Sequence, residues 1–301
     1  MFPSQQTWSA TRSNLLQRCP RAFVMRYGLG AISQHHPIGQ DLLHAFEIQT
    51  PWILLHQTIR NVVLDYVEDY TNGTIWSIGL LRARFVNDFT QLLEKRNQII
   101  ERIQTKGRIN ISNVQTLRSE NHLIEMGVKA STDLVQHPDF VSLLRDGSIS
   151  RIEPTHSIKK GGMRIYNAPD FIHRNKNSET LVKLNPFGDF SAAQRQHQAA
   201  LLRLHGGHGS TIVQFSLQQR RWDVRKTIPT EAEINDAITL VRLDIEHMEG
   251  LFSLVGRNNN LDNVPLSDTY RSCMNCQVRS MCPSKDGLER AKAEQFALMC
   301  V

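Results

Sequence analysis

Three cysteines lie within ten residues of one another late in the sequence, at Cys273, Cys276 and Cys282. Their spacing, C-x2-C-x5-C, allows one short loop to turn three sulfur atoms toward a common point, which is typical of a metal centre. Such a centre needs a fourth thiolate, and the remaining candidates are Cys300 and Cys19. If Cys19 is the fourth ligand, the early and late parts of the chain meet at the metal, and the chain between them forms a closed loop.

Composition restricts the class of protein. The 301 residues are 40% apolar and 21% charged, which is enough to bury a sizeable core. No stretch approaches the ~18 uninterrupted apolar residues of a membrane span. The five cysteines, in a sequence that does not start like a signal peptide, argue against a disulfide framework. We therefore expect a soluble, cytoplasmic protein with no membrane partner.

The net charge is moderately basic, at +6 with a pI near 9.2. This charge is compatible with a polyanionic partner, but many proteins that bind no polyanion share it.

The first half of the sequence has helical periodicity. Ser9 is a good N-cap for a short helix that Pro20 ends just after Cys19. Further helices are predicted over residues 40–70 with a break near Pro51, over 76–104, and over 112–145 with an interruption at Pro138.

The second half begins with short strands. They are predicted at residues 148–154, 163–166, 170–173 and 180–184, with hairpin turns at 159–162 and 175–178. A helix over 192–204, strands over 211–217 and 222–226, and a helix from a capping box of Thr230 and Glu233 to about residue 254 complete the pattern. This order predicts an α+β (α/β) fold with a small mixed sheet.

We expect one compact unit in four consecutive parts. These are an N-terminal helix with the first cysteine ligand (1–27), a helical region (28–147), the sheet core (148–228), and a C-terminal helix with the cysteine loop (229–301).

Two phrases and the element order resemble the RecB-like branch of the PD-(D/E)XK nuclease superfamily. The first phrase starts at Ser9 and ends in Cys19-Pro20-Arg21-Ala22-Phe23, and the second is the late cysteine cluster. The iron–sulfur members of the branch, the AddB C-terminal nuclease and the CRISPR-associated RecB-like exonucleases, are the most similar. The resemblance covers most of the chain and implies a restriction-endonuclease-like core with a large helical N-terminal insertion.

The resemblance implies that a 4Fe-4S cluster is bound by Cys19, Cys273, Cys276 and Cys282, leaving Cys300 out. Four thiolates also suit tetrahedral zinc, and the spacing does not separate the two metals.

The resemblance also implies catalytic positions. His56 corresponds to a helical histidine that approaches the metal, and Arg60 lies one turn after it. Glu153 falls on the first strand of the meander, where relatives often have a glutamate, and Asp170 matches the first metal-binding aspartate. Gln198 is the best counterpart of the glutamine in the family's Gln-x3-Tyr motif, in which Leu202 replaces the tyrosine; Gln194 and Gln196 open the same helix.

The next motif departs from the family pattern. A family strand ends in Asp/Glu-x-Lys, in which the carboxylate binds Mg²⁺ or Mn²⁺ and the lysine steadies the attacking water. Here Lys183 takes the carboxylate position and Asn185 the lysine position, or Leu181 takes the carboxylate position if Lys183 is the lysine. Neither alignment supplies the second acid, and the flanking Glu179 and Asp189 lack the required spacing. Such a site should bind Mg²⁺ or Mn²⁺ poorly.

Three functions are therefore compared. The chain is a degenerate nuclease relative that binds DNA or helps assemble a DNA repair or defence complex, an active metal-dependent nuclease, or a structural subunit whose partner is a protein. The degenerate strand favours the first and third. Single-stranded or duplex DNA ends are the expected ligand, and a helicase or CRISPR component the expected kind of partner. Basic residues near the expected cleft mildly favour nucleic acid: Arg12, Arg18, Arg21, Arg26, Lys159, Lys160, Arg174 and Lys176.

Overall fold

The computed structural model describes residues 6–31, 39–104, 119–145, 147–176, 178–186, 190–255, 259–269, 272–273 and 276–282. The chain forms two compact units, each built from separate stretches of sequence. Unit 1 comprises Met1–Thr50, Glu94–Gln115 and Arg242–Val301, and unit 2 comprises Pro51–Leu93 and Thr116–Val241. This division differs from the single unit with four consecutive parts that the sequence suggested.

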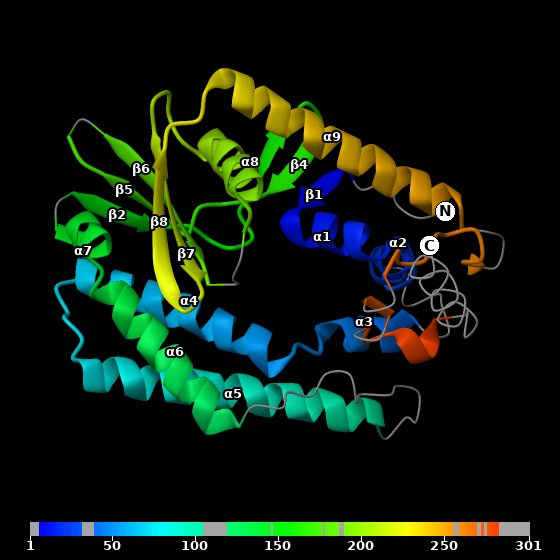
Figure 1. Ribbon diagram of the computed structural model, residues 1–301, viewed down its shortest axis with the longest axis horizontal. Coiled ribbons are helices and arrows are strands. Elements are labelled where there is room, and N and C mark those ends of the chain that lie inside the picture. Colours follow the sequence, from blue (N-terminus) through cyan, green and yellow to red (C-terminus); the bar gives the residue numbers. More distant parts are fainter. Residues whose placement is uncertain are drawn as a thin grey trace, which may run out of the picture. The chain divides into compact units, whose positions relative to one another are not determined.

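The described residues form a mixed α+β structure, which confirms the predicted fold class at that level (Figure 1). The helices are α1 (Ala10–Arg18), α2 (Pro20–Val24), the π-helix η1 (Met25–Leu29), α3 (Gly39–Glu47), α4 (Pro51–Thr71), α5 (Ile78–Gln104), α6 (Glu120–Val135), α7 (Pro138–Arg145), α8 (Ala192–Leu202) and α9 (Glu231–Ser253), with short 3-10 turns at Arg203–His205 and Arg279–Met281. The strands are β1 (Thr7–Ser9), β2 (Ser148–Arg151), β3 (Ile158–Lys160), β4 (Met163–Tyr166), β5 (Phe171–Arg174), β6 (Glu179–Asn185), β7 (Thr211–Gln218) and β8 (Arg221–Thr227). None of the helices described is both long and apolar enough to span a bilayer.

The element boundaries near Ser9 and Pro20 follow the sequence signals. The Ser9 side chain caps α1 by accepting a hydrogen bond from the Arg12 amide, as predicted. Helix α1 ends at Arg18 with Cys19 as its C-cap, just before Pro20, also as predicted. Pro20 then begins α2, because a proline at the first helical position forfeits no intrahelical hydrogen bond. Cys19 therefore lies between two helices, and its sulfur accepts from the Ala22 amide at 3.4 Å.

Unit 1 joins the early part of the chain to the late part. The Trp8 indole donates to Asp244 on α9 at 2.8 Å, and Phe23 stacks on Phe252 with ring centroids 5.6 Å apart. The Arg21 guanidinium donates to the Val264 carbonyl from Nε at 3.0 Å and from Nη2 at 2.7 Å. These contacts span more than 220 residues of sequence, so the early and late segments of the chain meet within unit 1.

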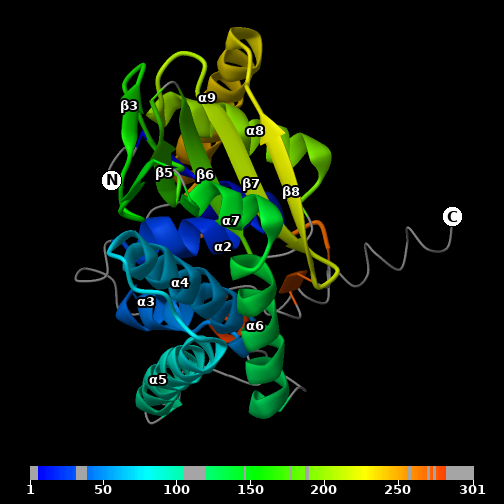
Figure 2. The same cartoon turned by 90° about the vertical axis from the view of Figure 1, so that its left-hand side faces the viewer.

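Unit 2 contains a five-stranded sheet in the order β2-β5-β6-β7-β8, and Figure 2 shows β5, β6, β7 and β8 side by side. The β6–β7 pair is parallel and joined through α8, and the other pairs are antiparallel. Because side chains alternate along a strand, each face has its own core. One face packs against α4, α6 and α7 through residues that include Val182, Val213 and Phe215, and the other packs against α8 through Leu181 and Ile212.

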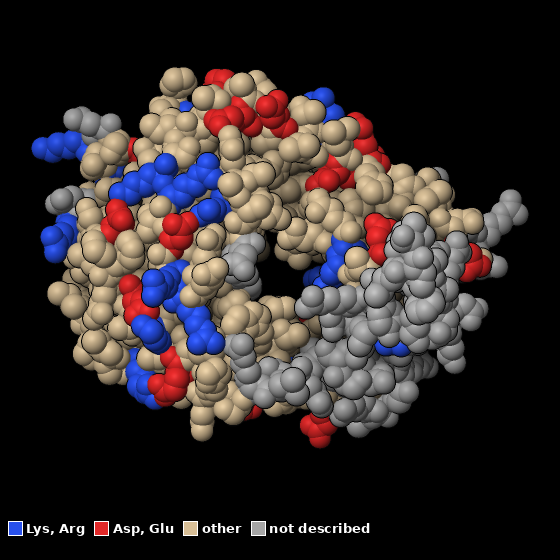
Figure 3. All heavy atoms as spheres, viewed as in Figure 1, with Lys and Arg blue, Asp and Glu red and all other residues tan. Residues whose placement is uncertain are grey.

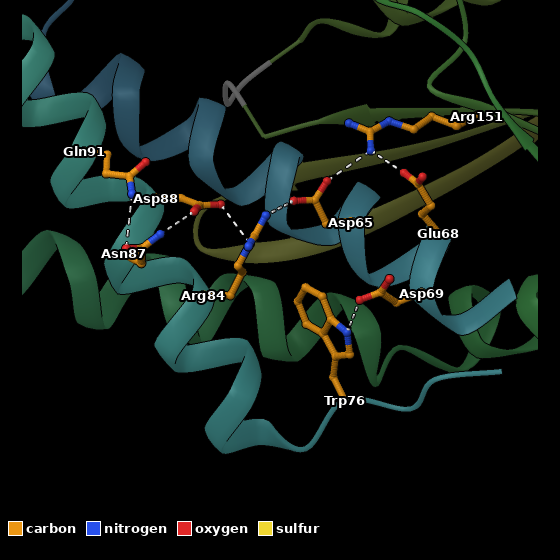
Figure 4. A network of polar contacts seen from close by, with 9 residues as sticks. All are labelled: Asp65, Glu68, Asp69, Trp76, Arg84, Asn87, Asp88, Gln91 and Arg151. Atoms are coloured by element: carbon orange, nitrogen blue, oxygen red, sulfur yellow. Dashed lines mark hydrogen bonds and ion pairs between the residues drawn. The ribbon is translucent and has the colours of Figure 1, made fainter. Parts of the chain in front are cut away.

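Ion pairs on the rim of unit 2 attach α4 to its neighbours (Figure 4). Arg151 at the end of β2 donates to Asp65 at 3.0 Å and to Glu68 at 2.8 Å, both on α4. Arg84 on α5 reaches the other oxygen of Asp65 at 3.2 Å. Each exposed pair contributes about 0.2–1 kcal/mol, but together they favour one orientation of α4, the helix that carries His56 and Arg60.

The outer strand β8 carries a high density of charge. Figure 3 shows Lys and Arg side chains beside Asp and Glu side chains on the part of the face that carries β8 in Figure 1. Arg195 of α8 pairs with Asp223, and Lys226 pairs with Asp139 at 2.5 Å. The charge on this face is therefore mixed, and Asp223 and Lys226 of β8 form ion pairs within unit 2.

Candidate functional site

Asp170 immediately precedes β5, which lies between β2 and β6 in the sheet. Its amide donates to the Val182 carbonyl at 2.8 Å, and its carbonyl accepts from the Ile152 amide at 3.0 Å, so neighbouring strands fix it on both sides. The residue has no exposed surface. A buried carboxylate needs compensating partners because removal from water is costly.

Arg60 is the principal partner of this carboxylate. Its Nε donates to Asp170 Oδ1 at 2.8 Å, and its Nη2 makes a second, shorter contact with the same oxygen. The other oxygen, Oδ2, accepts from the Leu184 amide at 2.6 Å. Both oxygens that would otherwise be available to a metal are therefore occupied by donors from the protein.

Lys183 adds a second cation. Its Nζ donates to the Ala168 carbonyl at 2.7 Å and lies 3.5 Å from Asp170 Oδ1. Burial lowers the pKa of Lys183, and Arg60 lowers it further, whereas Asp170 raises it. The side chains of Arg60 and Lys183 are 18% and 17% exposed, and that of Asp170 is 0% exposed. The two cations thus lie at the surface side of the group, with the carboxylate beneath them.

A network of amides lies on the face of the sheet that α8 covers. Gln198 Oε1 accepts from Asn185 Nδ2 and from Gln214 Nε2, both at 2.8 Å, and Gln198 Nε2 donates to Asn185 Oδ1 at 3.2 Å. Lys183 and Gln214 are direct partners in the β6–β7 register. The structure therefore brings Gln198 together with Asn185 and Gln214.

The remaining predicted positions behave differently. His56 is 3% exposed, its ring meets that of Trp52 edge-on at 4.6 Å, and burial lowers its pKa to about 4. His56 is therefore neutral at pH 7. Arg60, one turn later on α4, contacts Asp170. Glu153 does not lie on the first strand, which ends at Arg151, and it is exposed.

The other polar residues singled out on and near β6 and α8 contact protein groups. Glu179 accepts from the Gly207 amide at 2.8 Å and from Ser210 at 2.7 Å, while Gln194 closes the capping box of α8 with Ser191. Gln196 donates to Glu233. Asp189 lies outside the described residues.

The four predicted cysteine ligands all belong to unit 1. Burial is the main cause that raises the thiol pKa of Cys19, Cys273 and Cys276, and it raises that of Cys276 to about 11. The charge of at least one other cysteine of the four also raises the pKa of each of these three thiols. The thiols are therefore close enough to interact, with a donor set that suits zinc or an iron–sulfur cluster. Within the described residues, however, no three Cys, His, Asp or Glu side chains are arranged as a metal site. Cys300 lies outside them.

Several residues expected to favour nucleic acid have partners inside the protein. Arg21 is 5% exposed and bonded to the Val264 carbonyl, and Arg174 pairs with Glu179 at 2.9 Å. The Arg12 guanidinium lies over the Tyr27 ring at 4.5 Å.

Arg60 is the site residue to which the sequence assigned no role. The available signal was a cation one helical turn after His56, on the helix that the resemblance directs toward the metal. Gln214 was also missed, although a glutamine between two buried apolar residues, Val213 and Phe215, is a recognisable signal of a buried polar contact.

Comparison with known proteins gives one distant likeness. The structure is similar to the crystal structure of SSO0001, with a TM-score of 0.29 and 12% sequence identity over 74% of this chain and 95% of that chain. No protein-family model and no curated protein matches the chain. A likeness of this size carries no argument about fold family or function.

Proposed function

We propose that the chain is a catalytically degenerate PD-(D/E)XK nuclease-like iron–sulfur protein that acts on DNA. In this proposal it serves as a DNA-binding or assembly subunit of a repair or defence complex and does not itself cut. The order of strands and helices, with α8 crossing between the parallel strands β6 and β7, supports a nuclease-like core.

The observation that carries the loss of catalysis is the occupation of Asp170. Mg²⁺ and Mn²⁺ require several oxygen ligands, usually with more than one carboxylate. Here one carboxylate receives Arg60 and the Leu184 amide, and Lys183 lies where a second carboxylate would be needed. Two fixed cations repel a divalent ion at close range.

A cleavage and binding assay tests this function. Single-stranded and duplex DNA are incubated with the full chain and Mn²⁺, beside an Asp170→Ala variant, while binding is followed over a range of salt concentrations. We expect salt-dependent binding without cleavage. Cleavage that the substitution abolishes would instead identify an active nuclease, and the absence of any DNA binding would favour a protein-binding structural subunit.

The cofactor part of the proposal is tested separately by metal analysis and absorption spectroscopy. Four thiolates supplied by Cys19 and the late cysteines would hold a structural cluster. We expect iron and sulfide in anaerobically purified protein, absorption near ~400 nm, and equal loss in Cys19→Ser and Cys276→Ser variants. A colourless protein with stoichiometric zinc would replace the cluster by zinc.

A further inference from the structure

The group formed by Arg60, Lys183 and Asp170 carries unequal charge. Among the residues that the structure describes, two cations surround one carboxylate, which leaves a formal excess of one positive charge where each cation is less than one-fifth exposed. Among the groups that act electrostatically on Lys183, Asp170 is the anion and Arg60 the cation. A partly buried charge without a counter-charge is destabilising, so the site gains from an added anion.

The geometry presents the positive groups outward. Asp170 is fully buried and its two oxygens are satisfied by Arg60 and the Leu184 amide. A guanidinium has five N–H donors and an ammonium has three, so donors remain on Arg60 and Lys183 after the contacts with Asp170 and the Ala168 carbonyl. A guanidinium also matches the geometry of phosphate oxygens.

The nearby titratable side chain does not remove this excess. His205 acts on the same region, and its pKa is lowered to about 4 by burial, with His156 and Lys183 adding to the effect. It is therefore neutral at pH 7. The surrounding residues Asn185, Gln198 and Gln214 are neutral amides engaged with one another.

We propose that Arg60 and Lys183 form a metal-independent binding site for a phosphate group, with Asp170 as the buried counter-ion that holds the two cations in place. The site thus receives an anion where a catalytic relative would hold a cation. The choice of phosphate over other anions rests on the proposed action on DNA, whose terminal or backbone phosphate is the ligand.

The test measures phosphate and DNA binding without divalent metal. Inorganic phosphate is titrated while thermal unfolding is followed, with sulfate for comparison, and fluorescent oligonucleotides with and without a 5′-phosphate are titrated by anisotropy in EDTA. We expect Arg60→Gln and Lys183→Gln each to lower the affinity for inorganic phosphate and for DNA by roughly tenfold or more, because each variant loses a charge-assisted hydrogen bond. A preference for the 5′-phosphorylated oligonucleotide identifies a terminal phosphate, and equal affinity identifies the backbone.

Asp170→Asn distinguishes this site from a metal site. It keeps Arg60 and Lys183 as donors, so phosphate binding without metal persists, whereas a metal-binding site would lose its ligand. Matched controls are Arg82→Gln and Lys129→Gln, which remove exposed ion pairs with Glu125 and Asp133 elsewhere in unit 2 and should leave both affinities within about twofold.

The inference is overturned if Arg60→Gln and Lys183→Gln, folded as judged by circular dichroism, bind phosphate as the unmodified chain does. It is also overturned if binding requires Mn²⁺. If Asp170→Asn does not fold, the two cation variants decide. Unchanged DNA binding in those variants would refute this site but not the proposed function, while phosphate binding without DNA binding would refute the function but not the site.

Discussion

Arg60 determines what the Asp170 carboxylate can bind. One guanidinium from α4 reaches across 110 residues of sequence to the residue before β5, and each oxygen of the carboxylate then accepts a hydrogen bond from the protein. The residue type of Asp170 is compatible with a metal ligand, but the missing second acid and the contacts from Arg60 and Lys183 all oppose one. A long-range ion pair leaves no trace in local periodicity, which is why the sequence predicted the position of Asp170 but not its state.

Replacing both cations should convert the site. In an Arg60→Gln/Lys183→Glu double variant the guanidinium is absent and two carboxylates face each other where Lys183 Nζ now lies 3.5 Å from Asp170. We expect Mn²⁺ to raise the thermal midpoint of the double variant, with about 2.7 kcal/mol of stabilisation at a hundredfold excess over Kd. Arg60→Gln alone is the control, and Mn²⁺ should not raise its thermal midpoint. Equal stabilisation of the unmodified chain by Mn²⁺ would contradict the argument.

Gln198 should matter for stability through its amide. Gln198→Leu leaves Asn185 and Gln214, which are 3% and 0% exposed, without their shared partner. Unpaired buried amides cost roughly 1–3 kcal/mol, which urea unfolding measures directly. Gln196→Leu is the matched control on the same helix, because its exposed contact with Glu233 should be worth less than ~0.5 kcal/mol. Equal losses in the two variants would argue against the network.

At the scale of the helices and strands, periodicity and capping predicted most of the fold. The breaks at Pro51 and Pro138 and the capping box of Thr230 and Glu233 all occur as predicted. Strand β3 was missed because Lys159 and Lys160 resemble turn residues, yet they continue the strand until the turn at Gly161 and Gly162, where φ is positive. The part of the predicted third helix that covers residues 112–118 lies outside the described residues.

Helix α6 meets its neighbours through a glycine. A Cβ at Gly127 would clash with the Phe85 ring and approach Leu55 Cδ1 at 2.7 Å, whereas a Cβ at Gly250 in α9 would meet nothing within 4 Å. Alanine favours both helices by about 0.5–1 kcal/mol, but overpacking at Gly127 costs about 1–3 kcal/mol. We therefore expect Gly127→Ala to destabilise and Gly250→Ala to stabilise in urea unfolding. If both substitutions raised the free energy of unfolding, α6 would be able to move away from Phe85 and Leu55 at little cost.

At the scale of the whole molecule, buried histidines make stability depend on pH. Burial lowers the pKa of His56 to about 4 from 6.5. As the pH falls, His56 takes up a proton in the unfolded chain before it does so in the folded chain. The free energy of unfolding is therefore unaffected by the protonation of His56 above pH 6.5 and decreases between pH 6.5 and 4. The loss at pH 4 is on the order of 3 kcal/mol for this residue.

Urea unfolding at pH 7, 5.5 and 4.5 measures this dependence. His56→Gln should flatten the decline, and the exposed His208→Gln should leave it unchanged. A decline of the same size in His56→Gln would assign the acid sensitivity to other groups.

The division into two units was not predictable from local patterns. Boundaries at residues 93–94 and 241–242 fall inside α5 and α9, where neither proline nor glycine marks a break. The early cysteine phrase did indicate that distant segments meet, and the bonds from Trp8 and Arg21 show that they do so within unit 1. By contrast, no local pattern in the sequence indicated that Ile103 of α5 packs against Ile48 in unit 1.

The interleaved construction of unit 1 affects how the chain is made on the ribosome. The stretch up to Thr50 is synthesised before Asp244 and Val264, which accept hydrogen bonds from Trp8 and Arg21. Roughly 190 residues, from Pro51 to Val241, are synthesised between these two parts of unit 1. At ~5–20 residues per second, that delay is about 10–40 seconds. During this interval unit 2 can fold from nearly complete sequence, while Trp8 and Phe23 still lack their late partners. Nascent chains halted before residue 242 should therefore be the species most dependent on chaperones.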